Sequence, residues 1–291
     1  MRKLFIVHRR AALLLVGLVL LAQPLRAEPP PRAETMAEKT LKEIVARQRD
    51  IFAKAGKEGD QLDEAGLRGD LEGVVKSYDV LIQKNLDFAA AFVAYAQLLA
   101  KVGMTREAVA LYLKANKLDA EIPFVKNELA RLLAEDGKMI DALPWLMAAI
   151  DLEPREPLYH YHLGMLLTEG RDDFLRTGQF TRPALDKAMI EAFQKAAELA
   201  PTNFAYTYRA AEAYYDLETP RWDEALKVWG AIEEKAAPGL EKETIRLHAV
   251  NVLIKQGRPD HARALLVTVT DPKLAGQKQT LLDQLAKAGE K

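Results

Sequence analysis

Hydrophobic and small residues recur along most of this chain with the three- and four-residue spacing of amphipathic α-helices. Two consecutive stretches, 89–122 and 123–156, also share one longer pattern: Gly103 recurs as Gly137, Ala108 as Ala142, Ala115 as Ala149 and Leu118 as Leu152. Small residues at fixed offsets, repeated after about 34 residues, are typical of helical repeats that bury their apolar faces against their neighbours. The pattern therefore predicts an all-α solenoid of antiparallel helix pairs.

The period continues on both sides of these two stretches. Gly69 lies 34 residues before Gly103, and Tyr78 lies 34 residues before Tyr112. This spacing predicts a degenerate first unit at 55–88, in which several glycines weaken the helix. Three further units follow residue 156, so we expect about six units over 55–270. About 13 additional residues, at 169–181, interrupt the first of those three units.

Different patterns occupy the two ends of the chain. Residues 28–54 begin with three consecutive prolines, which favour an extended tether, and continue with an apolar stripe that predicts a leading helix. Residues 271–291 begin with Asp271 and Pro272, which suit an N-cap and a first helical turn, and continue with a leucine stripe. We therefore expect a capping helix at each end of the array.

The two central stretches resemble the tetratricopeptide repeat family. That family places large residues, a Leu and a small residue on its first helix, a Gly at the turn, and Ala, an aromatic residue, Ala and Pro along and after its second helix. Stretch 89–122 supplies Phe92, Tyr95, Ala96, Leu99, Gly103, Ala108, Tyr112, Ala115 and Ala120, and stretch 123–156 supplies Leu129, Ala130, Leu133, Gly137, Ala142, Leu146, Ala149 and Pro154. The resemblance implies a tetratricopeptide-type α-solenoid, a right-handed superhelix whose concave groove binds a protein or a peptide.

Residues 1–27 have the organisation of a secretory signal. A basic start precedes a twelve-residue apolar run from Ala11 to Ala22, which is short for a bilayer span, and Ala27 offers a cleavage position. We expect cleavage after Ala27 and a periplasmic or otherwise exported location in a bacterium. An uncleaved signal that anchors the chain is the alternative. The sequence contains no cysteine, which is compatible with an oxidising compartment.

Removal of such a signal changes the charge balance. The signal contains five basic and no acidic residues, so residues 28–291 carry 36 Lys and Arg against 42 Asp and Glu, a net charge of −6. A net acidic surface gains nothing from binding nucleic acid or an anionic membrane. We therefore expect no nucleic-acid partner, and a membrane contact only through an uncleaved signal.

Candidate ligand contacts follow from the resemblance, because the first helices of successive repeats line the groove of such arrays. In this register the candidates form a polar centre followed by an aromatic stretch, and they comprise Gln97, Asn127, Arg131, Tyr161, Tyr208, Glu212, Tyr215, Asn251 and Lys255. Arginine can pair with a ligand carboxylate, and tyrosine offers a large contact area with a polar tip. The alternative for each residue is a solvated side chain or a contact between repeats.

Part of the tetratricopeptide family clamps the terminal carboxylate of a peptide with Lys and Asn on the first two repeats and with Lys and Arg on the third. Asn127 and Arg131 occupy two positions that such a clamp uses. Val93 and Gln97, however, stand where the preceding repeat would need clamp residues. The clamp is incomplete, so we do not expect that specificity here.

No sequence motif points to catalysis or to a bound metal. His160 and His162 are two residues apart, so a helix directs their side chains to nearly opposite sides. The acidic residues of the insertion, Glu169, Asp172 and Asp173, lack the alternating pattern and the glycine of a calcium loop. Nucleophile elbows, phosphate-binding loops, dinucleotide fingerprints and zinc-protease motifs are also missing from the sequence. We therefore expect no cofactor, no metal and no enzyme activity.

Two features allow more than one interpretation. Trp222 and Trp229 lie seven residues apart on one helical face, and we expect them in the core, with a carbohydrate platform as the alternative. The insertion at 169–181 is either an element that contacts a partner, a passive surface loop or a lengthened second helix.

These observations favour a non-catalytic scaffold or adaptor that holds a peptide or protein segment in its groove, within an envelope-associated assembly. One alternative is a structural subunit that bridges other subunits or associates with itself. A less favoured alternative is a cell-wall enzyme that uses the helices as its body. Such an enzyme needs a catalytic Glu in a compact lobe, and no stretch of the sequence is left over to build one.

Overall fold

The computed structural model describes residues 33–58 and 63–289, and within these ranges the chain consists of α-helices and short 3-10 helices. In chain order the elements are α1 (Met36–Glu58), α2 (Glu64–Lys84), α3 (Ala89–Lys101), α4 (Thr105–Leu118), α5 (Pro123–Glu135), α6 (Met139–Leu152), α7 (Pro157–Glu169), α8 (Arg171–Arg176), α9 (Arg182–Leu199), α10 (Phe204–Glu212), η2 (Ala213–Asp216), α11 (Trp222–Lys235), α12 (Leu240–Lys255), α13 (Pro259–Val267), η3 (Pro272–Leu274) and α14 (Ala275–Gly289). None of these helices is both long enough and apolar enough to cross a bilayer. The signal-like segment 1–27 lies outside the described residues.

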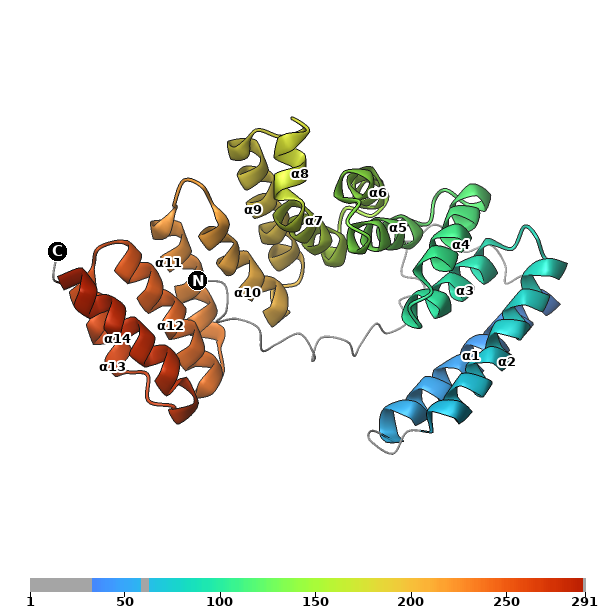
Figure 1. Cartoon of the computed structure of the whole chain (residues 1–291), viewed down its shortest axis with the longest axis horizontal. Coiled ribbons are helices and arrows are strands. Elements are labelled where there is room, and N and C mark those ends of the chain that lie inside the picture. The colour runs from blue at the N-terminus through green and yellow to red at the C-terminus, as the bar shows by residue number, and fades with distance from the viewer. Residues whose placement is uncertain (1–32, 59–62, 290–291) are drawn as a thin grey trace.

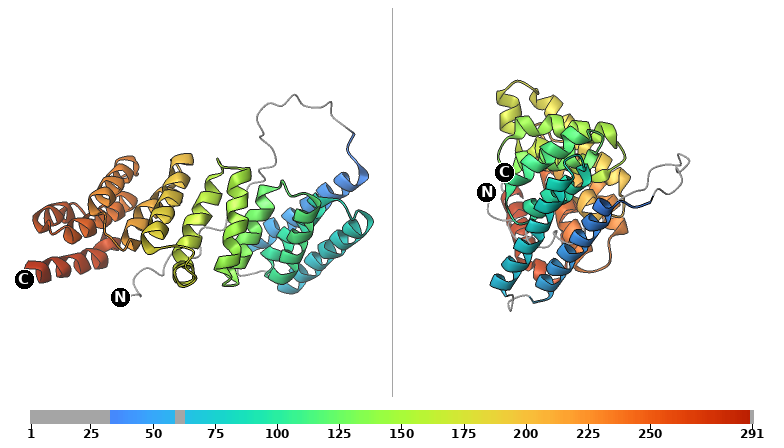
Figure 2. Two further views of the ribbon diagram at one scale, coloured as in Figure 1. Left: turned by 90° about the horizontal axis from the view of Figure 1, so that it is seen from above. Right: turned by 90° about the vertical axis from the view of Figure 1, so that its right-hand side faces the viewer.

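The helices pair with their neighbours and follow one another in an arch (Figures 1 and 2). The packed pairs are α1–α2, α3–α4, α5–α6, α7–α9, α10–α11 and α12–α13, and α14 packs against α12 and α13. Each pair also contacts the next, so the hydrophobic interior runs along the arch instead of gathering at one centre. The all-α solenoid predicted from the sequence period is confirmed.

The first pair differs from the sequence expectation. Helix α1 is not a separate leading cap, because it packs along α2 and buries Ile44, so the first pair spans 36–84 and not 55–88. Helix α2 forms in spite of its glycines, since Val74, Tyr78 and Leu81 of its second half are buried and the Asp63 carboxylate accepts a hydrogen bond from the Gly66 amide at 3.0 Å. One glycine also permits a close approach, because a Cβ on Gly73 would lie 2.8 Å from the Arg47 guanidinium of α1.

Small residues at the repeated positions lie where helices meet. Ala108 and Ala115 of α4 are fully buried, and so are their equivalents Ala142 and Ala149 of α6. Side chains of this size let two helices approach closely while larger neighbours fill the space around them. Gly103, in the turn between α3 and α4, has a φ of +82°, a conformation in which a residue with a Cβ is strained.

The insertion at 169–181 forms the short helix α8, which lies on the outer side of the arch (Figure 1). Phe174 of α8 is fully buried and packs edge-on against Phe180, with 5.7 Å between the ring centroids. Gly170 precedes α8 in a tight space, because a Cβ there would lie 2.8 Å from the Cβ of Met139 on α6. The insertion is therefore anchored in the core, and is neither a loose loop nor an extension of α9. Its contact with a partner stays a prediction.

The buried alanines give a direct test of the helix contacts. We expect Ala115→Leu to lower the free energy of unfolding by about 1–3 kcal/mol, because the larger side chain overpacks a fully buried position. Lys117→Leu, on the exposed side of the same helix, is the control and should change it by no more than about 0.5 kcal/mol. Urea denaturation monitored by circular dichroism measures both. Equal stability of the two variants would contradict the packing of α4.

Candidate binding groove

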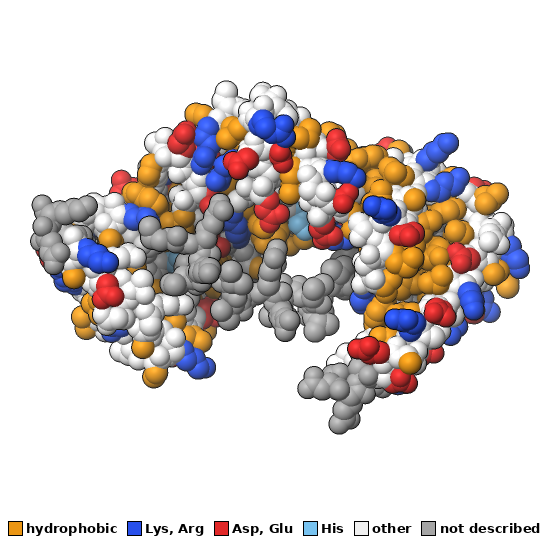
Figure 3. Space-filling model, viewed as in Figure 1, with side chains coloured by type: hydrophobic (Ala, Val, Ile, Leu, Met, Phe, Trp, Pro, Cys, Tyr) orange, Lys and Arg blue, Asp and Glu red, His pale blue; other side chains and the backbone are white. Residues whose placement is uncertain are grey.

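The inside of the arch is the candidate binding surface. Figure 1 shows α5, α7, α10 and α12, the first helices of their pairs, toward the inside of the arch, and α6, α9, α11 and α13 toward the outside. Helix α3 is the first helix of the preceding pair. All the candidate contact residues lie on these first helices or on η2, which continues α10. On the face seen in Figure 3, the surface is hollowed below α5 and α7, where acidic side chains gather beside a histidine.

Asn127 lies beneath the groove surface, because its side chain is fully buried. Its amide nitrogen donates to Oε1 of Glu128 at 3.2 Å, and its amide oxygen lies 2.7 Å from Nδ1 of His162 on α7. An amide oxygen only accepts hydrogen bonds, so neutral His162 carries its proton on Nδ1 and donates it to Asn127. This arrangement corrects the expectation that Asn127 contacts a ligand, since its side chain instead joins α5 to α7.

Arg131 is bound by carboxylates of its own helix. Its Nη2 lies 2.9 Å from Oε2 of Glu128, and its Nη1 lies 2.5 Å from Oε1 of Glu135. These spacings of three and four residues bring the side chains together on one helical face. A ligand carboxylate would have to displace both glutamates, so Arg131 has no spare positive charge to offer as a clamp.

The aromatic stretch begins where α7 meets α10. Tyr161 of α7 is half-buried and packs edge-on against Phe193 of α9, with ring centroids 5.9 Å apart. The ring centroid of Tyr206 on α10 lies 5.0 Å from that of Tyr161. Contacts to two other helices therefore fix the orientation of Tyr161 on the groove side of α7.

A second aromatic group joins α10, α11 and α12. Trp229 of α11 is fully buried and stacks on His248 of α12, with ring centroids 4.2 Å apart and an interplanar angle of 11°. The Tyr208 hydroxyl lies 2.5 Å from Nε2 of His248, and the Tyr208 ring packs edge-on against Trp229. The Tyr215 hydroxyl donates to the His248 carbonyl oxygen at 3.2 Å. Both groove tyrosines are thus held from below by Trp229 and His248.

The remaining candidates lie at the edges of this aromatic group. Burial raises the pKa of Tyr215 to about 12, and neighbouring Asn251 acts in the opposite direction on that pKa. The Lys255 ammonium lies over the Trp222 ring, 5.2 Å from its centroid. Gln97 is exposed on α3, well before the aromatic stretch in the chain.

Glu212 is the one candidate carboxylate on α10. Burial raises its pKa, and the neighbouring charge of Asp216 raises it further, while the charge of Arg209 lowers it. It lies four residues after Tyr208 and three before Tyr215, so the three side chains share one face of the helix.

No protein-family model matches this chain, and no curated protein sequence matches it. Solved structures do match its fold. PilF of Pseudomonas aeruginosa aligns with 88% of this chain and 100% of its own, at 15% identity and a TM-score of 0.55. YrrB, described as a TPR protein with an unusual peptide-binding site, aligns with 75% of this chain and 100% of its own, at 17% identity and a TM-score of 0.54. MamA of Desulfovibrio magneticus RS-1 aligns with 69% of this chain and 96% of its own, at 18% identity and a TM-score of 0.50.

The chain has the tetratricopeptide-repeat fold. At these identities the likeness concerns fold alone, and the chemistry of the groove has to be argued from its own residues. The tetratricopeptide solenoid explains the position of the candidates, because residues one repeat apart come side by side on adjacent helices. Asn127 and His162 are 35 residues apart, and Tyr215 and His248 are 33 residues apart.

Two histidines are the residues that sequence reasoning missed. His162 and His248 have no companion at metal-ligand spacing, yet each lies under the groove and hydrogen-bonds to a candidate residue about one repeat away. The sequence signal that could have identified them is a pair of polar residues separated by about one repeat length, because such residues lie side by side on adjacent repeats. Within the described residues no three His, Cys, Asp or Glu side chains come close enough to share a metal ion. His160 lies elsewhere, with its Nε2 2.8 Å from the Pro154 carbonyl oxygen.

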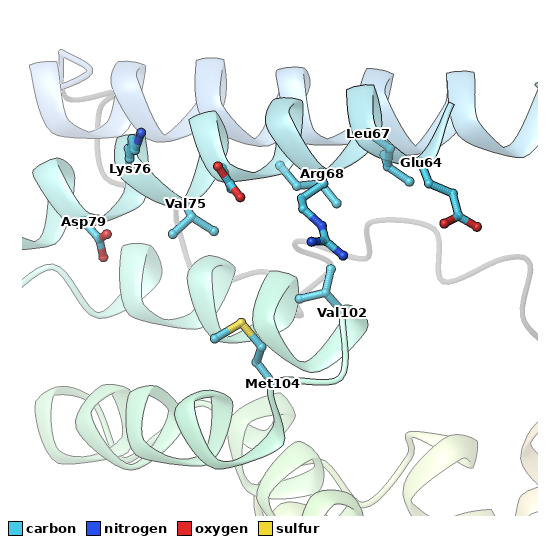
Figure 4. A pocket seen from close by; sticks show the side chains of 10 residues that line it. Glu64, Leu67, Arg68, Val75, Lys76, Asp79, Val102 and Met104 are labelled. Carbon is cyan, nitrogen blue, oxygen red and sulfur yellow. The ribbon is translucent and has the colours of Figure 1, made fainter. Parts of the chain in front are cut away.

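A second hollow lies outside the groove, between α2 and the turn that joins α3 to α4 (Figure 4). Its volume is about 750 Å³, and its floor is formed by Leu67, Leu71, Val75, Val102 and Met104. The apolar patch on the right of Figure 3 covers this region. Its rim carries both signs of charge, from Glu64, Arg68, Glu72, Lys76 and Asp79, so charge does not favour one class of partner there.

Proposed function

We propose that this chain is a non-catalytic scaffold that holds a peptide or protein segment in the concave groove of its solenoid. The main observation behind this proposal is that partly exposed groove tyrosines are held in place from below: Tyr208 and Tyr215 contact Trp229 and His248, and Tyr161 packs on Phe193. Tyrosine is enriched at protein interfaces because it combines a large apolar area with a polar tip. Side chains that are already ordered also lower the entropic cost of binding.

A solved relative in fold supports a peptide as the ligand. YrrB, whose structure aligns with 75% of this chain, is described as having an unusual peptide-binding site. In the described part of the groove, Asn127 is buried and Arg131 is paired with two glutamates, so these two residues do not form a free carboxylate clamp. The bound segment is therefore held by its side chains or backbone, and its carboxyl terminus is not the feature recognised.

The location of the scaffold is a further part of the proposal. The signal-like residues 1–27 support export to the cell envelope, with cleavage after Ala27, and the lack of cysteine suits a periplasmic protein. We therefore place the scaffold in an envelope-associated assembly, where it brings its bound segment to other components.

Site-specific cross-linking in the source cells tests this function. A photo-reactive residue in place of Gln97 or Lys255, both exposed on first helices, should give the same cross-linked product, and that product should fractionate with the envelope. The same residue in place of Lys117 or Glu234, exposed on the second helices α4 and α11, is the matched control and should not give it. Equal cross-linking from both faces, or from the controls alone, would contradict a groove function.

A further inference from the structure

Glu212 stands among three tyrosines in the second half of the groove. Tyr208, Glu212 and Tyr215 share one face of α10 and η2, and Tyr161 of α7 packs against the Tyr206 ring of α10. Burial raises the pKa of each of these three tyrosines, and the charge of Glu212 raises each pKa further. All three hydroxyls therefore lie within electrostatic range of this one carboxylate.

The Glu212 carboxylate has no partner at contact distance. Within the described part of the chain it forms no hydrogen bond and no ion pair, although it is largely withdrawn from solvent. Arg209 is the cation whose charge lowers the pKa of Glu212, but it pairs with other groups. Its Nη2 lies 3.0 Å from Oδ2 of Asp216, and its guanidinium lies over the Phe193 ring. A half-buried carboxylate without a partner is costly unless a ligand supplies the missing charge.

We propose that this site takes the cationic side chain of a lysine or arginine in the bound segment, with its charge on Glu212 and its stem against Tyr161, Tyr208 and Tyr215. This chemistry rests on the proposed groove function and defines the class of segment that the groove accepts. Cations are attracted both to a carboxylate and to the faces of tyrosine rings. A ligand carboxylate would instead meet like charge, and a neutral side chain would leave Glu212 unpaired.

The surroundings of the site favour the same ligand. Two more glutamates lie near tyrosines of α7 and α10. Burial is the main cause that raises the pKa of Tyr206 and of Tyr161, and the charge of Glu156 raises that of Tyr206 further, as the charge of Glu169 does for Tyr161. The basic residue of the preceding repeat, Arg131, is neutralised by its two glutamates. A basic segment is thus attracted to the part of the groove between α7 and α10, where Glu212 lies.

Selection from a library of random 12-residue peptides tests the site before any partner has been identified. The wild-type chain should enrich peptides that contain Lys or Arg. A selected peptide should bind about tenfold more weakly when its key arginine is replaced by citrulline, which has nearly the same shape and no charge, or when the chain carries Glu212→Gln. Added salt should weaken wild-type binding more than binding to the Glu212→Gln variant.

The control is Glu234→Gln, which removes the same charge from an exposed position on α11 and should bind as the wild type does. Melting temperatures confirm that both variants fold. Selected peptides without basic residues, or a Glu212→Gln variant that discriminates arginine from citrulline as the wild type does, would overturn the cation site and leave the groove function standing. If no peptide is enriched by the wild type, both the site and the peptide-binding groove are contradicted.

Discussion

Replacing Trp229 with alanine is expected to lower the free energy of unfolding by about 3–5 kcal/mol, the usual cost of truncating a large aromatic side chain in a core. Trp229 is fully buried and lies between the stacked His248 and the edge-on Tyr208. The cavity cannot be closed by a neighbour without moving α10 against α12. We therefore expect the groove tyrosines to lose their fixed orientation even where the fold survives.

Urea denaturation measures the loss of stability, and Trp222→Ala is the matched control. Trp222 begins the same helix but is partly exposed, so its removal should cost clearly less than that of Trp229. Peptides selected by the wild-type chain should also bind Trp229→Ala more weakly at a temperature where it is folded. A Trp229→Ala variant as stable as Trp222→Ala would mean that α11 does not pack as described.

Acid is expected to destabilise the protein strongly between about pH 6.5 and pH 4. Burial lowers the pKa of His162 from 6.5 to about 4, with a further contribution from the charge of Arg131, and burial lowers the pKa of His248 to about 4 as well. In this window the unfolded chain takes up protons that the folded chain refuses, so the free energy of unfolding falls as the pH falls. Each histidine contributes a loss of about 3 kcal/mol across the window.

Two variants isolate the histidine contribution from that of the carboxylates. His248→Phe retains an aromatic ring against Trp229 and cannot titrate, and His162→Gln retains a side chain that can donate to Asn127. Each should flatten the fall of stability between pH 6.5 and pH 4, measured by urea denaturation at several pH values. Gln97→Ala, an exposed change on α3 that removes no titratable group, is the control and should leave the slope unchanged. An unchanged slope in the first two variants would contradict their burial as neutral side chains.

The proposed cation site changes which polar groove residue is expected to bind a ligand. A family resemblance directs attention to Arg131 as a partner for a ligand carboxylate, but the structure gives that arginine two carboxylate partners of its own. Among the described groove residues, Glu212 is a carboxylate without an ion-pair partner, while the exposed Lys255 ammonium lies over the Trp222 ring farther along the groove. The ligand that this groove suits is therefore the electrostatic opposite of the one that the carboxylate clamp binds.

The pairing of α1 with α2 is a feature that could not be predicted from the sequence. Glycines in the 55–88 stretch predicted a weak, degenerate unit, since each costs about 1 kcal/mol in a helix interior. The structure instead pairs α1 with α2, because burial of Val74, Tyr78 and Leu81 in the second half of α2 offsets that cost. Propensity acts residue by residue, whereas the burial of a whole helix face depends on which neighbour it meets.

The sequence by itself determined the architecture: a regular period with small residues at fixed offsets permits only helices that stack on their neighbours, and it placed the turn at Gly103 and the buried Ala115. The resemblance to tetratricopeptide repeats added the expectation that the first helices of the pairs line the groove. Only the tertiary structure decided which groove side chains are available to a ligand. Asn127 meets His162 one repeat later and is buried, while Glu212 forms no ion pair within the described residues, because pairing between adjacent repeats depends on side-chain geometry that no period in the sequence records.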